Sequence, residues 1–305
     1  YMLESRKISQ KLMPDLCSSN NLQGIEQYPT LLRAILEENA YVDKPFIVVL
    51  TPGRFNSAYY EHAFLAREMD VPLVTSRDLF VENDKVFAKT IRGRQQVDVI
   101  YRRVDDEFLD PLVFRADSTL GVAGLMSAYL QNNVVIANAP GTGVADDKSI
   151  YPYVDQMIQY YLGETPILSN VPTYQCRDSD QLDYVLNNLE KLVVKEAQGS
   201  GGYGMLIGPQ ADQQQIEQFR QKIMQTPHLY IAQPTLALSV APTLTTDGVA
   251  ERHIDLRPFV LSSPYRTEIV PGGLTRVAMQ AGSLVVNSSQ GGGIKDTWVV
   301  ESLHS

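Results

Sequence analysis

The sequence predicts an α/β protein, and three observations support this fold class. Up to residue 140, short β-branched apolar runs alternate with amphipathic helical segments, which is typical of a parallel sheet flanked by helices. Beyond that point, strands are separated by glycine-rich turns, which indicates a second region of α+β type. The length of 305 residues suits two domains at roughly 150 residues each.

The first region begins with a helical pattern over residues 25–39. A continuous apolar run at 46–50 then predicts a buried strand of parallel type. Further patterns predict a helix at 59–69, strands at 71–74 and 97–101, and a hairpin at 81–89. This order indicates an open sheet of Rossmann type.

The chain continues with a predicted helix at 119–131, a strand at 134–137 and a helix from Asp146 through Tyr161. Another helix is expected at 180–190 and a last strand at 284–286. We therefore expect a Rossmann-like domain over 1–145 and a second region of α+β type over 146–305.

Charged residues follow the predicted strand at 97–101. Open α/β sheets bind ligands at the carboxyl ends of their strands, so Arg102, Arg103, Asp105 and Asp106 could hold a zwitterionic or peptide-like substrate. A solvated salt-bridge cluster explains the same residues equally well, and both interpretations stay open. No Gly-x-Gly-x-x-Gly follows the 46–50 strand, which disfavours an NAD-dependent dehydrogenase.

The most informative segment is a glycine-rich hairpin at 192–208. Lys195 ends an apolar strand, and the tip comprises Gly199, Ser200, Gly201, Gly202, Tyr203 and Gly204. Glycines let backbone N–H groups approach phosphates, and a lysine supplies a compact positive charge. A flexible hairpin with an exposed lysine is the alternative, but a lysine in an apolar strand favours an anion partner.

Polar residues occur within or at the ends of the later predicted strands. Asp255 and Arg257 lie two residues apart in an alternating strand and share one face. His253 is on that face too, where a lone histidine is usually structural. Asn287 ends an apolar run and is either a ligand or a turn residue.

Composition excludes several classes. A net charge of −9 argues against sequence-independent binding of nucleic acid or membranes. No apolar run approaches the roughly 18 residues of a membrane span. Cys17 and Cys176 lack metal-like spacing and are expected as buried thiols in a reducing cytoplasm.

The sequence resembles the circularly permuted ATP-grasp family (type 2), which is related to glutathionylspermidine synthetase. The resemblance runs over nearly the whole chain, and the matching segments are 51–62, 101–106, 141–148, 194–204, 231–234, 252–258 and 287–298. It implies a Rossmann-like pre-ATP-grasp domain, followed by two α+β subdomains that bind ATP between them.

The resemblance also implies an activity, an ATP-dependent carboxylate–amine ligase that forms a peptide-like bond through an acyl phosphate. Lys148 and Lys195 would contact phosphates, the 199–204 loop would close over them, and Ile231, Ala232 and Gln233 would hold adenine. Arg257 and Arg276 would contact the transferred phosphate. Mg²⁺ would use Asp255 and Asn287.

Two further expectations follow from the resemblance. The chain begins at Tyr1, inside a sequence motif of the family that spans residues 1–4, so we expect a fragment that lacks an upstream acidic-x-Asn metal motif and is weakly active. The alternative to a ligase is a nucleotide-binding or scaffold module that works with partner proteins, including an all-helical one.

Overall fold

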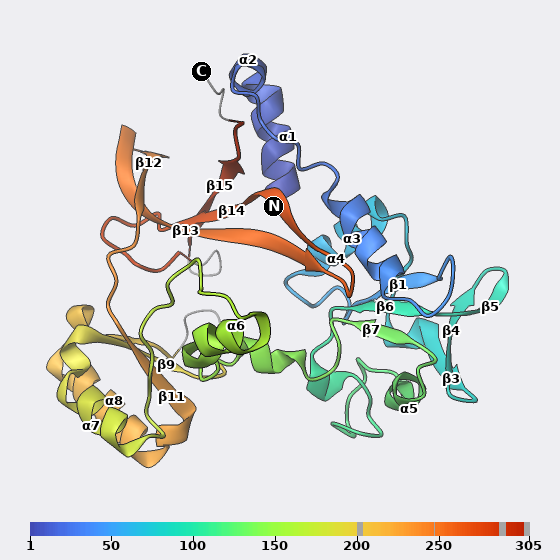
Figure 1. Ribbon diagram of the computed structural model, residues 1–305. Helices are drawn as coiled ribbons and strands as arrows, with labels where there is room; N and C mark the ends of the chain where they lie inside the picture. The colour runs from blue at the N-terminus through green and yellow to red at the C-terminus, as the bar shows by residue number, and fades with distance from the viewer. Residues whose placement is uncertain (200–203, 247, 287–290, 302–305) are drawn as a thin grey trace. The chain divides into compact units, whose positions relative to one another are not determined.

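The computed structural model describes residues 1–199, 204–246, 248–286 and 291–301 (Figure 1). It contains two compact units, and neither is one continuous stretch of chain. Unit 1 comprises 1–141, 256–275 and 295–305, and unit 2 comprises 142–255 and 276–294. The expected domain boundary at residue 145 stays a prediction.

Unit 1 contains a parallel four-stranded sheet of order β2-β1-β6-β7. Its strands are β1 (Ile47–Leu50), β2 (Leu73–Val74), β6 (Val99–Arg102) and β7 (Val135–Ala137). In the register, Ile47 lies opposite Val99, and Val99 lies opposite Val135. The predicted open parallel sheet is therefore present.

Both faces of this sheet are buried, which explains the continuous apolar run in β1. Ile47 and Val49 pack on the side of α3 (Tyr28–Glu38) and α4 (Tyr59–Glu68). Val48 and Leu50 pack on the side of α5 (Leu125–Leu130) and an antiparallel β-meander. The meander strands are β3 (Leu79–Glu82), β4 (Lys85–Thr90) and β5 (Gly93–Gln96).

Two helices precede this sheet, α1 (Met2–Leu12) and α2 (Pro14–Ser19). Arg6 of α1 is fully buried and pairs with Asp296 at 2.8 Å. Its remaining guanidinium nitrogens donate to the carbonyl oxygens of Gln23 and Thr297. These contacts connect the first helix to the last described strand.

Unit 2 contains an antiparallel sheet of order β10-β9-β11-β8. Its strands are β8 (Tyr174–Gln175), β9 (Leu192–Glu196), β10 (Leu206–Ile207) and β11 (Tyr230–Pro234). The helices α7 (Ser179–Asn187) and α8 (Gln213–Gln225) supply the core of one face, whereas α6 (Val154–Leu162) has no buried residue. Cys176 is buried here and Cys17 is buried in unit 1, as expected.

A third sheet has the order β12-β13-β14-β15. Its strands are β12 (Val240–Thr245), β13 (Gly248–Ser262), β14 (Thr267–Val277) and β15 (Gly293–Trp298). The chain passes from one unit to the other within β13, β14 and β15. Short 3-10 segments at 76–78, 106–108, 142–146, 151–153, 189–191, 208–210 and 227–229 connect the elements.

Three predicted elements were wrong in extent or type. The helix expected from Asp146 begins only at Val154, because Pro152 allows a short 3-10 turn and then a new helix start. The helix expected at 119–131 is confined to α5, because Gly124 precedes it with a φ of 82°. Residues 284–286 form no strand and pack as irregular chain.

In the part of the chain that the structure describes, no helix has the length and hydropathy needed to cross a bilayer.

Candidate functional site

Lys195 lies on the face of β9 that points away from the core of unit 2. Leu192 and Val194 pack against α7 and α8, so strand alternation places Val193 and Lys195 on the opposite face. The Lys195 Nζ donates to Oε1 of Gln233 at 2.9 Å. The Gln233 Nε2 then donates to Oγ1 of Thr173, also at 2.9 Å.

A cavity of about 140 Å³ lies on this face of unit 2. Among the described residues that line it, Lys195 alone is charged; the others are Val171, Val193, Met205, Ile207, Gln233, Pro234, Leu236, Leu238 and Leu284. An ammonium group beside an apolar hollow can meet the phosphate end of a ligand whose flat, apolar part enters the hollow.

Lys148 approaches the same place from another segment. Its Nζ donates to the carbonyl oxygens of Glu196, Ala197 and Gly199, which form the root of the glycine hairpin. Its backbone N–H also donates to the Ala197 carbonyl at 2.9 Å. The structure therefore brings both predicted lysines to one end of β9.

Burial lowers the pKa of Lys195, and the nearby positive charge of Lys148 lowers it further. Each ammonium group donates to neutral oxygen acceptors, and these do not cancel the repulsion between the two positive charges in a partly buried site. A bound phosphate would relieve that repulsion, so the site is suited to an anionic ligand.

The glycine hairpin is described at its two ends. A Cβ at Gly199 would lie 3.0 Å from Cβ of Glu196, and a Cβ at Gly204 would lie 3.2 Å from its Oε1. Gly204 also has a φ of 65°, which favours glycine. The side chain of Glu196 therefore occupies the space beneath both glycines. The predicted contacts Ser200, Gly201, Gly202 and Tyr203 lie outside the described residues.

The three residues predicted to hold adenine differ in whether they line the cavity. Ile231 pairs with Lys195 in β9, and Ala232 pairs with Tyr174 in β8, so their backbones lie inside the sheet. The Ala232 side chain is buried against α7 and α8. Among these three, Gln233 alone lines the cavity.

The predicted metal and phosphate-transfer residues lie on the long strands. Asp255 and Arg257 are on β13 and Arg276 is on β14, while Asn287 lies outside the described residues. In the described ranges there is no group of three or more histidine, cysteine, aspartate or glutamate side chains that could hold a metal. Mg²⁺ binds several oxygen ligands, so these residues do not by themselves form its site. The ring of His253 has a structural contact, because its Nδ1 lies 3.0 Å from the Leu238 carbonyl oxygen.

A second polar cluster lies at the carboxyl ends of β1 and β6 in unit 1. β1 is followed by β2 on one side and has β6 on the other, so this end is a topological switch point where open α/β sheets bind ligands. Arg103 pairs with Glu61 of α4 at 2.9 Å, and both side chains remain partly exposed. Arg103 also donates to the Tyr101 hydroxyl at 3.4 Å.

The neighbouring residues Arg102 and Asp106 contact mainly the protein itself. Arg102 pairs with Asp106 at 2.7 Å and donates to the carbonyl oxygens of Asn138 and Ala139. Asp106 accepts from the Gly141 N–H at 3.2 Å. This pair therefore joins two loops, whereas Asp105 is exposed beside them.

Sequence reasoning assigned no role to Glu61, to Thr173 or to the buried pair of Thr51 and His62. Oγ1 of Thr51 lies 2.9 Å from Nδ1 of His62, and burial lowers the pKa of His62 to about 4. A neutral histidine thus supports the turn after β1. Thr51, Glu61 and His62 lie in the matching segment 51–62, but no local pattern gives them a role, because each role depends on a partner outside its own local element.

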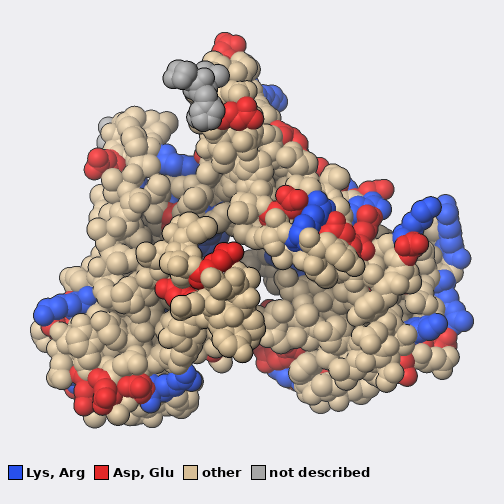
Figure 2. Space-filling model, viewed as in Figure 1, with Lys and Arg blue, Asp and Glu red and all other residues tan. Residues whose placement is uncertain are grey.

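Acidic and basic side chains are interspersed over the face that Figure 2 shows, so the net charge of −9 is not concentrated there in one patch. The pair formed by Lys148 and Lys195 is a local group of positive charges in a chain of negative net charge.

Comparison with known proteins identifies relatives over almost the whole chain. An uncharacterised protein of Synechocystis sp. is 54% identical over 303 residues, which cover 99% of this chain and 63% of that protein. An uncharacterised protein of Mycobacterium tuberculosis is 49% identical over 98% of this chain and 55% of its own length. A protein of Frankia alni that carries the name of a candidate glutamate–cysteine ligase is 42% identical, over 98% of this chain and 35% of its own.

The chain thus spans from about a third to about two thirds of the length of these relatives. Among solved structures, D-alanyl-alanine synthetase A from Vibrio cholerae matches with a TM-score of 0.46 at 9% identity, over 87% of this chain and 77% of that one. The family described as circularly permuted ATP-grasp type 2 matches residues 1–278. The chain belongs to the circularly permuted ATP-grasp type 2 family.

Proposed function

We propose that this protein takes part in an ATP-dependent ligation that joins a carboxylate to an amine. The observation that carries the proposal is the Lys195 ammonium, which faces an apolar cavity beside Lys148 at the root of the glycine hairpin. Membership of the ATP-grasp family supports ATP as the ligand of that site.

The proposed chemistry has two steps. A carboxylate oxygen attacks the γ-phosphorus of ATP, and ADP leaves with the electron pair of the broken P–O bond. The amine nitrogen then attacks the acyl carbon, phosphate leaves, and the amine loses a proton. Both steps depend on positioning and neutralisation of phosphate charge.

Within this proposal, Lys148 and Lys195 bind phosphates, and Gln233 orients Lys195 and borders the adenine. Arg257 and Arg276 contact the phosphate that is transferred. Mg²⁺ would neutralise phosphate oxygens, with Asp255 as the described candidate ligand. That single carboxylate does not complete a metal site.

The substrate site is proposed at the carboxyl ends of β1 and β6. The partly exposed Arg103 can pair with a carboxylate and Glu61 with an ammonium, which together match a zwitterionic small molecule or a peptide end. The Frankia name describes a protein of which this chain matches 35%, so glutamate and cysteine remain candidates to be tested.

Two measurements test the proposal. Calorimetry with ATP and Mg²⁺ should show binding that Lys195→Met weakens and Lys191→Met, at an exposed lysine nearby, leaves unchanged. ADP release should then depend on a pool of amino acids and dipeptides, and hydroxylamine should trap the acyl phosphate as a hydroxamate. Absence of ATP binding in the full-length protein would refute the proposal.

The second candidate is a nucleotide-binding module that assembles with partner proteins, such as an all-helical one, and ligates nothing. It is favoured by the missing metal cluster in the described ranges. ATP binding without ADP release for any substrate pool, in the full-length protein, would support this module over the ligase.

A further inference from the structure

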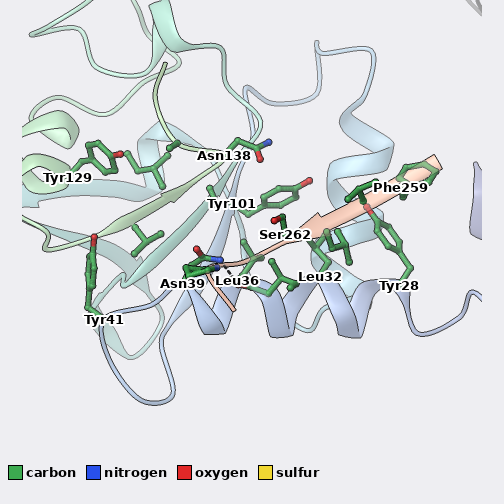
Figure 3. A pocket seen from close by; sticks show the side chains of 18 residues that line it. Tyr28, Leu32, Leu36, Asn39, Tyr41, Tyr101, Tyr129, Asn138, Phe259 and Ser262 are labelled. Carbon is green, nitrogen blue, oxygen red and sulfur yellow. Dashed lines mark hydrogen bonds between the residues drawn. The ribbon is translucent and has the colours of Figure 1, made fainter. Parts of the chain in front are cut away.

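Unit 1 contains a second cavity, of about 540 Å³, whose lining includes neither Arg103 nor Glu61 (Figure 3). Cavities of roughly 300–1,000 Å³ are typical of ligand sites. None of the 18 lining residues carries a charge. Its occupant must therefore be uncharged where it touches the walls, unlike ATP or a zwitterion.

One wall of the cavity is the edge of β7. The consecutive residues Val135, Ile136 and Ala137 all line it, although strand residues alternate between the two faces of a sheet. The Ile136 side chain is buried in the core on the α5 side, and its neighbours pack on the α3 side. A cavity that touches all three must therefore lie along the backbone edge of the strand.

That edge of β7 has no strand partner among the described residues. β7 is the last strand of its sheet and pairs only with β6. The Val135 N–H donates to the Asp98 carbonyl oxygen, so Val135 and Ala137 direct their backbone groups toward β6. Because successive residues of a strand direct these groups to opposite edges, the N–H and C=O of Ile136 point away from β6, toward the cavity.

A second wall is the end of β13. Phe259, Val260, Leu261 and Ser262 line the cavity consecutively, so it again lies along a strand edge. β14 pairs with one edge of β13, and β12 pairs with the other only over residues 248–253. In the described chain, the second edge therefore lacks a strand partner at Phe259–Ser262.

We propose that this slot, defined as the cavity between the free edges of β7 and β13, binds an extended peptide with uncharged side chains, supplied by a partner. Unpaired strand edges bind added strands through main-chain hydrogen bonds. Alternate side chains of the peptide would meet the apolar row of Leu32 and Leu36 on α3, which Figure 3 shows along one side of the cavity.

The probe is an acetylated and amidated hexapeptide of alternating threonine and valine with a fluorescent label, and anisotropy without ATP reports its binding. We expect micromolar binding. N-methylation of the peptide's backbone nitrogens should weaken it at least tenfold, because it removes the donors for the strand edges. The probe has no free carboxylate or amine, so its failure to bind would leave the proposed ligation standing.

Two variants on one face of β13 locate the site. Val260 lines the slot from the exposed face of β13, so Val260→Lys adds a charged side chain at the rim of the slot and should weaken binding at least tenfold. Leu256→Lys, at a similarly exposed residue outside the slot, should change it less than twofold. Hydrogen exchange of the Ile136 amide should slow at least tenfold with the hexapeptide, which tests the edge without any substitution.

Three outcomes would overturn the proposal. The first is no binding of the hexapeptide up to millimolar concentration. The second is equal binding of the N-methylated peptide. The third is a dimer in sedimentation that Val260→Lys abolishes, because the slot would then be filled by a second copy of the chain.

Discussion

Replacing Lys195 by methionine tests the candidate nucleotide site most directly. Two unit charges about 4 Å apart interact by ~4 kcal/mol at an effective dielectric constant of about 20. Lys148 would remain next to the phosphates and solvent would replace part of the lost contact. We therefore expect a loss of about 2–3 kcal/mol in binding free energy, which is a roughly 30- to 150-fold rise in Kd for ATP.

The same substitution should leave the fold intact. Burial and Lys148 lower the pKa of Lys195, so keeping its ammonium charged costs more in the folded protein than in the unfolded chain, and methionine has similar length without the charge. The free energy of unfolding in urea at pH 7 should stay equal or rise. Lys191→Met is the matched control, since that lysine side chain is 73% exposed. An unchanged Kd, or a marked loss of stability, would show that Lys195 is structural.

Three further predictions concern single residues. Gly204 and Gly163 both have a positive φ, which alanine adopts only at a cost, so Gly204→Ala and Gly163→Ala should each lower the unfolding free energy by about 1–2 kcal/mol. Only Gly204→Ala, whose Cβ would meet Glu196, should weaken ATP binding in calorimetry. Asp110→Ala should lower the unfolding free energy by about 3 kcal/mol in urea, because it leaves one buried and two partly buried N–H groups without their acceptor, whereas exposed Asp117→Ala should cost under about 0.5 kcal/mol. The pKa of about 4 for buried His62 lies below its unfolded value of 6.5, so stability should be full above pH 6.5 and fall as pH drops toward 4. The contribution of His62 to this loss between pH 7 and 4.5 should be about 2–3 kcal/mol, so His62→Gln should lose less stability over this range by that amount, while carboxyl groups with lowered pKa still contribute.

The fold was predictable where local pattern and burial agree. The run at 46–50 is apolar throughout because both sheet faces are covered, and the structure confirms a parallel strand there. The hairpin around the glycines is confirmed as β9 and β10. Predictions failed where a proline restarts a helix, as at Pro152, or where an apolar run packs without strand partners, as at 284–286.

The candidate site was predictable in residue type and less so in geometry. Lys195 and Gln233 were both expected near the nucleotide, yet their hydrogen bond depends on the antiparallel register of β9 and β11. Arg102 and Arg103 are adjacent and equivalent in sequence. In the structure, Arg102 binds loop carbonyls and Arg103 pairs with Glu61, because each side chain meets partners from distant segments.

The sequence by itself determined the α/β class, the family resemblance and the glycine-rich hairpin with its lysine. These are local properties, since they depend on residue type and spacing along the chain. Only the tertiary structure decided which polar groups already have partners and which strand edges are open. Those features depend on pairing between segments that are far apart in sequence, and strand register cannot be read from one strand alone.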